Sequence, residues 1–386
     1  MIKRELSLEL VKVLKEYPVV TILGPRQSGK TTLARETLPD YLYCNLESPE
    51  NREYARQDPK TFLKQFKGPV ILDEIQRVPE LLSYIQVIVD EKKVNGQFVL
   101  TGSHQLILRE SITQSLAGRT SILELLPFSI SELKEAGIEF DTFEEYILNG
   151  FLPRIYDQNQ RPTPAYSNYF QTYVERDVRL LINLKDVTLF EKFIRLLAGR
   201  VGQIFDYSSI AGDVGVDAKT IKNWLSILEA SYIIYKLNPY FENFGKRVIK
   251  SPKYYFFDVG LLAFVLGIED LRHIKRDPLI GSIFENLVVI EALKNRLNKG
   301  KISNLYFYRD EKKNEIDLLA VQGREITSVE IKSSSTYSTS LTEGLLKFKK
   351  NNPQVVQSIL IYSGDEKSAG ENLLAINFRH TSNYLS

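Results

Sequence analysis

The sequence has very few of the residues that build disulfides and metal centres. It contains one cysteine, Cys44, and three histidines among 386 residues. A single cysteine excludes an internal disulfide and a cysteine-based zinc site, and three scattered histidines argue against a histidine metal site.

Long apolar runs are also missing. No stretch of roughly 18 or more apolar residues occurs, so no membrane span is expected. The first segment, MIKRELSLELVKVLKEYP, alternates charged and apolar residues at helical spacing and lacks the apolar block of a signal peptide. We therefore expect a cytoplasmic protein with no membrane partner.

A large excess of one charge is absent as well. The chain has 50 Lys and Arg against 48 Asp and Glu, a net charge of +2. Bulk electrostatics therefore do not predict a nucleic-acid binder, although local basic clusters could still attract phosphates. At about 150 residues per domain, the length predicts two or three domains.

A phosphate-binding loop is the clearest feature that is present. The segment GPRQSGKT fits G-x-x-x-x-G-K-[ST] and follows a β-branched apolar run, PVVTILG. Backbone N–H groups of such a loop point at phosphates, its lysine reaches the β- and γ-phosphates, and its threonine holds Mg²⁺. The predicted nucleotide-binding residues are Gly24, Pro25, Arg26, Gln27, Ser28, Gly29, Lys30, Thr31 and Thr32.

A second apolar strand carries the acids that hydrolysis requires. In GPVILDEIQ, Asp73 and Glu74 follow the strand about forty residues after the loop. We expect Asp73 to bind Mg²⁺ and Glu74 to polarise the attacking water, as a Walker B element does. Gln76 has no assigned role and could be a surface residue.

A third buried strand, in GQFVLTGS, ends in polar residues that could sense the γ-phosphate. Such a strand usually lies between the first two in the additional-strand type of P-loop ATPase. We expect Ser103 to be the sensor, with Thr101 as the alternative. No Asn-Lys-x-Asp element follows, so adenine is the default base over guanine.

Arg119, in SLAGRTSILE, has two readings that stay open. It could reach the γ-phosphate of a neighbouring subunit and stabilise the transition state, which would require a homo-oligomer. It could equally be a surface arginine or form a salt bridge with Glu124.

Together, LGPRQSGKTTLARE, VILDEIQRVPEL, LTGSHQLIL and LAGRTSILELLPFSISE resemble the prokaryotic AAA-type ATPases that carry a C-terminal domain of unknown function. The resemblance covers nearly the whole chain. It implies an ATP-binding N-terminal module and supplies no settled biological role.

The middle of the chain predicts helices and then a winged helix. A helix broken at Gly150 and Pro153 precedes an amphipathic helix over residues 166–186, whose aromatic stripe we assign to a core. Two short helices joined by a glycine turn lie in residues 205–230, and two strands flank a basic turn in residues 232–258. The predicted DNA-binding residues are Lys219, Lys222, Lys246 and Arg247. The alternative is a dimer or inter-domain joint.

Four charged residues in the last third predict a phosphodiester site. Glu285 lies near the start of a helix, Asp317 lies on a strand, and Glu330 and Lys332 share one face of the next strand. Carboxylates bind Mg²⁺ or Mn²⁺, and a neighbouring lysine stabilises negative charge that develops in the reaction. This set of residues resembles the core positions of the PD-(D/E)xK nuclease fold. The resemblance implies that the metal ligands are Glu285, Asp317 and Glu330 and that the catalytic residues are Glu330 and Lys332.

The sequence thus predicts an α/β protein. Its parts would be an AAA-type ATPase domain with a parallel sheet, a helical connector, a winged helix and a restriction-endonuclease-like domain, over residues 1–140, 141–200, 201–265 and 266–386.

The predicted function is a Mg²⁺-dependent ATPase that acts on DNA. The alternative is a nucleotide-dependent switch or assembly scaffold whose nuclease-like fold is catalytically silent and binds protein or DNA.

Overall fold

The structure is a computed structural model that describes residues 2–103, 112, 114–178, 187–240 and 250–385. Residue contacts divide the chain into two compact units. The N-terminal unit holds residues 1–128, with residues 230–232 and 297–301. The second unit holds residues 129–229, 233–296 and 302–386. The predicted domain boundaries at residues 140, 200 and 265 stay predictions.

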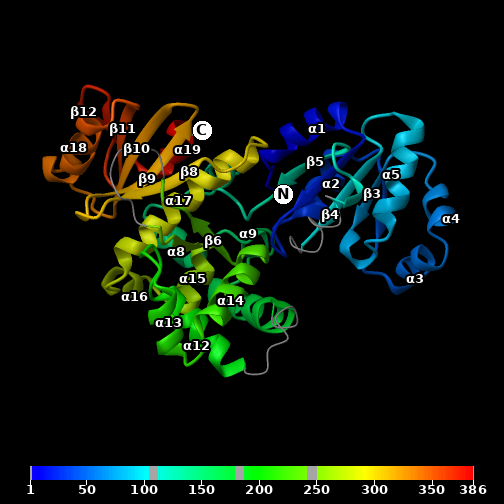
Figure 1. The fold of residues 1–386 in the computed structure, drawn as a ribbon, viewed down its shortest axis with the longest axis horizontal. Helices are drawn as coiled ribbons and strands as arrows, with labels where there is room; N and C mark the ends of the chain where they lie inside the picture. The colour runs from blue at the N-terminus through cyan, green and yellow to red at the C-terminus, as the bar shows by residue number, and fades with distance from the viewer. Residues whose placement is uncertain (1, 104–111, 113, 179–186, 241–249, 386) are drawn as a thin grey trace. The chain divides into compact units, whose positions relative to one another are not determined.

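The N-terminal unit is built on a parallel five-stranded sheet of order β2-β3-β4-β1-β5. In Figure 1 these strands run from blue to cyan-green. Both β1 and β4 are buried at every position, as expected for central parallel strands. The strands are β1 (Val19–Leu23), β2 (Leu42–Asn45), β3 (Val70–Asp73), β4 (Phe98–Gly102) and β5 (Thr120–Glu124).

The expected position of the third strand is confirmed. The strand β4 lies between β1 and β3, and pairs Val99 with Val20 of one neighbour and with Ile71 of the other. Because parallel strands end at the same edge of a sheet, the residues that follow β1, β3 and β4 come together. This edge carries the phosphate loop, Glu74 and Ser103.

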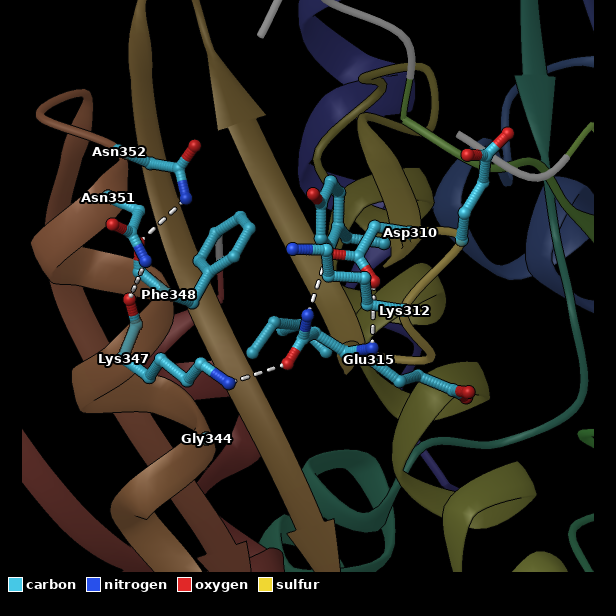
Figure 2. A pocket seen from close by; sticks show the side chains of 12 residues that line it. Asp310, Lys312, Glu315, Gly344, Lys347, Phe348, Asn351 and Asn352 are labelled. Carbon is cyan, nitrogen blue, oxygen red and sulfur yellow. Dashed lines mark hydrogen bonds between the residues drawn. The ribbon is translucent and has the colours of Figure 1, made fainter. Parts of the chain in front are cut away.

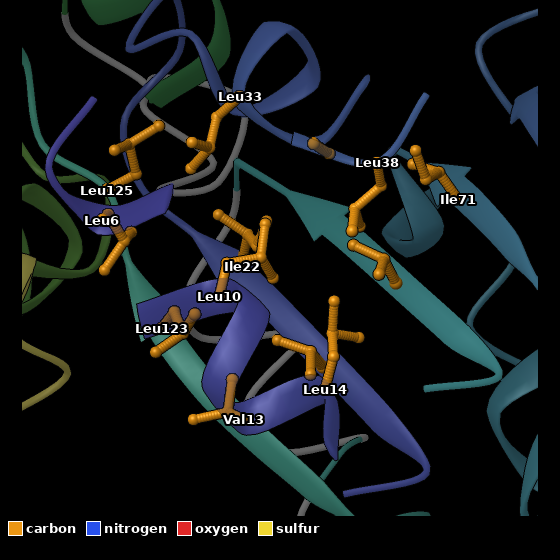
Figure 3. Packing of buried hydrophobic residues seen from close by; sticks show 13 residues of the cluster. Leu6, Leu10, Val13, Leu14, Ile22, Leu33, Leu38, Ile71, Leu123 and Leu125 are labelled. Carbon is orange, nitrogen blue, oxygen red and sulfur yellow. The ribbon is translucent and has the colours of Figure 1, made fainter. Parts of the chain in front are cut away.

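Helices pack against this sheet. Helix α1 buries Leu6, Leu10, Val13 and Leu14, spaced three or four residues apart, against Ile22 and other strand residues (Figure 3). Each such buried side chain contributes roughly 1.5–3 kcal/mol. The helices are α1 (Leu6–Glu16), α2 (Lys30–Thr37), α3 (Pro49–Gln57), α4 (Pro59–Lys64), the short 3₁₀ turn η1 (Ile75–Arg77) and α5 (Leu81–Lys92).

The second unit begins with helices. As predicted, one helix ends at Asn149 and the next begins at Pro153, with Gly150 at φ 60° between them. A side chain at position 150 would collide with the Tyr166 ring, so glycine is required there. The helices before the sheet are α7 (Ile130–Glu135), α8 (Phe143–Asn149), α9 (Pro153–Asp157), α10 (Pro162–Tyr169), α12 (Val187–Ala198), α13 (Tyr207–Val214), α14 (Ala218–Ala230), α15 (Val259–Val265), α16 (Leu271–Arg276) and α17 (Ile280–Asn298).

The amphipathic helix predicted over residues 166–186 differs from a regular α-helix. Residues Phe170–Val178 form a π-helix, η2, directly after α10, and residues 179–186 lie outside the described part of the chain. Tyr169, Tyr173 and Val174 are buried, which agrees with a core role for the aromatic stripe. A π-turn widens the helix and changes which residues face inward, so helical spacing alone did not predict it.

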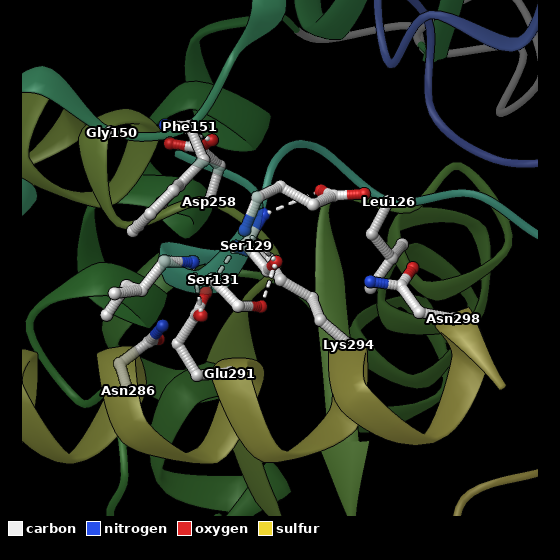
Figure 4. Close-up of polar contacts among 12 residues, drawn as sticks. Leu126, Ser129, Ser131, Gly150, Phe151, Asp258, Asn286, Glu291, Lys294 and Asn298 are labelled. Carbon is white, nitrogen blue, oxygen red and sulfur yellow. Dashed lines mark hydrogen bonds and ion pairs between the residues drawn. The ribbon is translucent and has the colours of Figure 1, made fainter. Parts of the chain in front are cut away.

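Two buried carboxylates hold the helices of this unit together (Figure 4). Asp258 accepts hydrogen bonds from the Phe151 amide at 3.0 Å and from the Tyr166 hydroxyl at 2.6 Å, and also caps α15. Glu291 accepts from the Ile130 amide and pairs with buried Lys294, each at 2.7 Å. Because buried charges are costly unless partnered, these contacts specify how the helices pack.

Two helices and a hairpin occupy the region predicted as a winged helix. Helix α13 ends at Val214 and is followed by Gly215 at φ 96°, and α14 buries Ile221, Trp224 and Leu225 as predicted. Asp217 caps α14 through the Thr220 amide at 2.7 Å. The strands β6 (Ile234–Leu237) and β7 (Lys253–Phe256) then pair antiparallel.

The last third forms a mixed six-stranded sheet of order β12-β13-β11-β10-β9-β8, orange to red in Figure 1. Strands β8, β9 and β10 form an antiparallel meander, and β10 pairs parallel with β11. The elements are β8 (Leu305–Arg309), β9 (Glu315–Gln322), β10 (Glu325–Lys332), η3 (Thr339–Thr342), α18 (Glu343–Asn351), β11 (Val355–Tyr362), β12 (Lys367–Gly370), β13 (Leu373–Asn377), η4 (Phe378–His380) and α19 (Thr381–Tyr384).

The β6–β7 hairpin is bonded to this last third. The Asn286 side chain of α17 exchanges two hydrogen bonds with the Phe256 backbone, at 2.7 and 2.8 Å. Beyond β6, the Tyr240 amide donates to the Phe307 carbonyl, and the Phe307 amide donates to the Asn238 carbonyl. These backbone hydrogen bonds extend the contact to β8. Among the described residues, no helix is long and apolar enough to cross a membrane.

Candidate functional site

The loop between β1 and α2 has the backbone conformation of a phosphate-binding loop. Gly24 adopts φ 153°, and a Cβ there would lie 2.1 Å from the Leu125 carbonyl oxygen. Gly29 (φ 90°) and Gln27 (φ 62°) take left-handed conformations before α2 begins at Lys30. These turns direct the loop across the start of α2, where the helix dipole favours an anion.

Lys30 lies buried beneath this loop. Its ammonium group donates to the carbonyls of Gly24 at 3.0 Å and Pro25 at 2.7 Å. Burial lowers the pKa of Lys30 to about 8, against the opposing attraction of Glu74 and Asp73. A charged lysine held mainly by backbone carbonyls is prepared to bind a phosphate.

Asp73 is fixed by three hydroxyl groups at the end of β3. Thr31 donates to its Oδ1 at 2.9 Å, and Thr101 donates to the same oxygen. Tyr43, on β2, donates to Oδ2 at 2.9 Å. The pairing of Thr31 with Asp73 brings together the two side chains that the sequence predicts for Mg²⁺.

Glu74 is held by both its backbone and its side chain. It adopts φ 57°, and its amide donates to Thr101 Oγ1 at 3.1 Å. Ser103 donates to Glu74 Oε2 at 3.1 Å, and Gln76 donates to that same oxygen. Thus Ser103 contacts the predicted water-polarising acid, whereas Thr101 contacts Asp73 and the Glu74 backbone.

The structure also brings the predicted residues of the last third together. Lys332 pairs with Glu330 at 2.6 Å and with Asp317 at 3.3 Å, and the Ile331 amide donates to Asp317 at 2.8 Å. Burial, with repulsion from Asp317, raises the pKa of Glu330 to about 7, and Glu285 adds to the same effect. Glu330 Oε2 is buried without a hydrogen-bond partner among the described residues.

Lys253, from β7, also belongs to this cluster. From the sequence it is instead grouped with Lys246 and Arg247 in the basic turn as a phosphate contact, which its burial contradicts. Its ammonium group pairs with Glu285 at 3.1 Å and Glu315 at 2.7 Å, and only 2% of the side chain is exposed. Burial acts to lower the pKa of Lys253, but Glu285, Asp317 and Glu315 outweigh it and raise the pKa. Tyr255, also on β7, donates to Glu285 at 2.6 Å.

A metal ion fits this cluster only in part. The unpartnered Glu330 oxygen is a group that a cation would satisfy, and carboxylates are suitable ligands. Within the described ranges, however, no three histidine, cysteine or acidic side chains are grouped as metal ligands. Lysines already pair with all four carboxylates: Lys253 contacts Glu285 and Glu315, and Lys332 contacts Asp317 and Glu330.

A cavity of about 620 Å³ lies between the β8–β9 turn and α18 (Figure 2). Lys347 donates to Asn314 at 2.8 Å, and Asn314 in turn donates to Asp310. Tyr308, Phe348 and Glu315 also line the cavity. This cavity was not predicted from the sequence, because its lining comes from β8, β9, the turn between them and α18, and no motif links these segments.

Comparison with known proteins agrees with the N-terminal geometry. Residues 16–134 match the family described as AAA domain. These residues are therefore similar to AAA-type ATPase domains. The match supports a nucleotide-dependent ATPase, and it implies ATP with Mg²⁺ as the ligands of the AAA domain.

The rest of the chain matches families without an assigned role. Residues 140–272 and 280–380 match two domains of unknown function, DUF8612 and DUF4143. Uncharacterized proteins of Mycobacterium tuberculosis and Haemophilus influenzae are similar over most of the chain. The first is 28% identical over 95% of this chain and 81% of its own length, and the second is 25% identical over 98% of both.

Solved structures are similar at lower identity. A Walker-type ATPase of Pyrococcus abyssi is 16% identical, with a TM-score of 0.43, over 68% of this chain and 94% of its own. The RuvB Holliday junction branch migration motor of Thermotoga maritima is 21% identical, with a TM-score of 0.31, over 61% and 90%. Both TM-scores are below 0.5, so no property of these two proteins is inferred for this chain.

Two contacts in the N-terminal unit were not predicted from the sequence. Arg4 is buried, and its guanidinium donates to the carbonyls of Ser28 and Leu126, each at 2.7 Å. Tyr43 binds Asp73, as described above. Neither residue belongs to a motif, so only the fold brings Arg4 to the phosphate loop and Tyr43 to Asp73.

Arg119 of the AAA domain forms a forked ion pair within the chain. Its Nε and Nη2 atoms contact the Asp90 carboxylate at 2.6 and 2.9 Å. Arg119 thus forms a salt bridge, and its partner is Asp90 of α5. Contact with a neighbouring subunit stays a prediction.

The predicted DNA-binding residues are described only in part. Lys219 and Lys222 are exposed at the start of α14, where Lys222 lies over the Tyr207 ring at 5.2 Å. Lys246 and Arg247 lie outside the described residues.

Proposed function

We propose that this protein is a Mg²⁺-dependent ATPase that acts on DNA. The observation that carries the proposal is the hydrogen-bonded set at the ends of β1, β3 and β4. It places Lys30, Thr31, Asp73 and Glu74 next to one another, each with a separate task in phosphoryl transfer.

Each residue of this set has a chemical task. Thr31 and Asp73 would hold Mg²⁺, which neutralises phosphate charge when it is bound. Lys30 exchanges its carbonyl partners for phosphate oxygens, and the amides of residues 24–30 orient the triphosphate. Glu74 accepts a hydrogen bond from the attacking water and directs it at the γ-phosphate.

The exposed start of α14 supports the action on DNA. Lys219 and Lys222 lie on the solvent side of this helix, because Ile221, Trp224 and Leu225 take the buried side. A helix that follows a short glycine turn and presents its N-terminal residues is the arrangement by which helix-turn-helix modules read DNA. The β6–β7 hairpin is where a wing would lie.

The carboxylate–lysine cluster supports phosphodiester chemistry. An α-helix, a three-stranded meander, a helix and a parallel strand come in the order expected of the PD-(D/E)xK fold. In this proposal Asp317 and Glu330 would hold a Mg²⁺ or Mn²⁺ ion, with Glu285 close by, and Lys332 would stabilise the developing charge. Homo-oligomer formation, with Arg119 acting between subunits, belongs to the same proposal.

A second candidate is a nucleotide-dependent switch or scaffold with a silent nuclease-like fold. The observation that favours it is Lys253, which neutralises Glu285 and Glu315 from inside the protein. This candidate predicts slow turnover, nucleotide-sensitive oligomerisation and no cleavage even with Mn²⁺.

One experiment tests both sites. ATP hydrolysis and plasmid cleavage are measured for the wild type, Lys30→Ala and Glu330→Ala, with and without DNA and with Mg²⁺ or Mn²⁺. We expect Lys30→Ala to abolish hydrolysis and Glu330→Ala to abolish cleavage. The matched controls are Lys15→Ala and Glu325→Ala, two exposed residues of the same units.

The outcomes separate the candidates. No saturable ATP binding by the wild type would overturn the ATPase proposal. Hydrolysis without cleavage, together with a nucleotide-dependent change in molecular mass, would favour the switch. Failure to bind DNA at low salt would contradict the action on DNA.

A further inference from the structure

Gln76 has a specific place in the AAA domain that its sequence position did not indicate. It follows Asp73 and Glu74 in the 3₁₀ turn η1, and its side chain turns back toward the acids. Its Nε2 atom donates to Glu74 Oε2 and to Ser103 Oγ, the latter at 3.3 Å. With the Ser103 bond to Glu74, these contacts close a ring of three side chains.

The chemistry of this ring fixes the direction of each bond. An ionised carboxylate only accepts hydrogen bonds, so the Gln76 amide must present its NH₂ group to Glu74. The Gln76 Oε1 atom is then buried with no partner among the described residues. Within the described part of the chain, the Gln76 side chain therefore hydrogen-bonds to Glu74 and Ser103 alone.

The ring holds one carboxylate oxygen of Glu74, Oε2, and leaves Oε1 to orient the attacking water. Gln76 and Ser103 both donate to Oε2, whereas the Glu74 backbone is fixed by its left-handed conformation and by Thr101. A left-handed conformation at a non-glycine residue is costly and persists where surrounding contacts enforce it. A group that orients water benefits from such preorganisation, since a misplacement of about 1 Å can cost 10²-fold in rate.

We propose that Gln76 is a positioning residue for ATP hydrolysis, and that it acts by holding the Glu74 carboxylate in the orientation that directs the attacking water. This inference rests on the proposed ATPase function. It assigns Gln76 no contact with the nucleotide, because Lys30, Thr31 and the loop amides provide the binding.

The test is steady-state ATP hydrolysis by the full chain with Gln76→Leu, which keeps the size of the side chain and removes both donors. We expect kcat to fall about 10- to 100-fold while KM and the Kd of a non-hydrolysable ATP analogue stay within about twofold. The matched control is Gln97→Leu, since Gln97 lies in the same unit and its side chain donates to the Val94 carbonyl, away from Glu74. Its kcat should equal that of the wild type.

A double-mutant cycle with Glu74→Gln separates positioning from a structural role. If Gln76 acts through Glu74, Gln76→Leu causes no further loss in the Glu74→Gln protein. A wild-type kcat in Gln76→Leu, a loss of analogue binding, or an additive loss in the double variant would each overturn the inference. Absence of hydrolysis in the wild type would instead overturn the proposed function.

Discussion

The phosphate loop and the carboxylate–lysine cluster treat their charged groups in opposite ways. At the first site, Asp73 and Glu74 follow β3 beside the loop and are held by neutral hydroxyl and amide donors, and Lys30 donates to backbone carbonyls. In the cluster, Lys253 and Lys332 pair directly with the acids. The first site keeps its charges for a ligand, whereas the second neutralises much of its charge internally.

A short motif determines the first site more completely than the second. The loop residues are consecutive, so one backbone conformation fixes them all, and neighbouring strands add Asp73 and Glu74 at the same edge. The cluster residues come from β7, α17, β9 and β10, and the same carboxylates suit either a metal or a lysine. Measurements on the lysines and acids can therefore sharpen the contrast.

The largest effect is expected for Lys253→Met. Removing this lysine leaves Glu285 and Glu315 without their buried partner, which should lower the free energy of unfolding by about 3–5 kcal/mol. The measurement is urea unfolding at pH 7, with Lys250→Met, an exposed residue just before β7, as the control. A loss under about 1 kcal/mol would mean that the internal pairing is not what holds the cluster.

A smaller effect of opposite sign is expected for Glu330→Gln. The pKa of Glu330 is raised to about 7, so in the range from pH 4.5 to 7 the folded state binds its proton more tightly than the unfolded state. Stability from this group is thus lost as pH rises through 7. The glutamine variant should be more stable than the wild type by roughly 1–3 kcal/mol at pH 8.

This gain should shrink toward zero below pH 4.5, and Glu325→Gln, at the exposed start of the same strand, should show no gain at either pH. Thermal unfolding across this pH range gives the measurement. An unchanged or destabilised protein at pH 8 would show that the Lys332 pair outweighs the burial of Glu330.

The smallest effect concerns ATP affinity and Lys30. With a pKa of about 8, Lys30 in the free protein loses its charge as pH rises through 8, and the neutral amine binds phosphate poorly. The Kd of an ATP analogue should therefore rise about tenfold between pH 7.5 and 9, by the linkage of binding to protonation. Fluorescence titration measures this change.

Lys30→Arg is the comparison, because arginine keeps its charge throughout this range. Its affinity should be weaker overall and should not change between pH 7.5 and 9. An equal slope in both proteins would assign the pH dependence to another group.

The sequence predicted the phosphate loop and its sheet edge well, because glycine turns and buried parallel strands leave strong local patterns. The expected place of β4 between β1 and β3 is confirmed, and Asp73, Glu74 and Ser103 lie at the ends of these strands, while their catalytic roles stay predictions. The sequence did not predict the contacts of Tyr43, Lys253 or Gln76, because each depends on which distant segment the fold brings near.

The helical part was predicted less completely for a physical reason. Breaks at Gly150 and Pro153 follow from backbone chemistry, so they were found, whereas the π-helix at Phe170–Val178 depends on packing. The winged-helix and nuclease-like assignments stay predictions, since secondary-structure order alone does not establish a family.

The two hydrogen bonds between Asn286 and the Phe256 backbone limit where this polypeptide can be cut. A fragment that starts after Phe256 would lack the Phe256 backbone that bonds Asn286 and the Tyr255 hydroxyl that bonds Glu285. Both side chains would then be exposed to water. Anyone wishing to study the last third in isolation should retain the hairpin from Ile234 onward, since β7 supplies part of its interior.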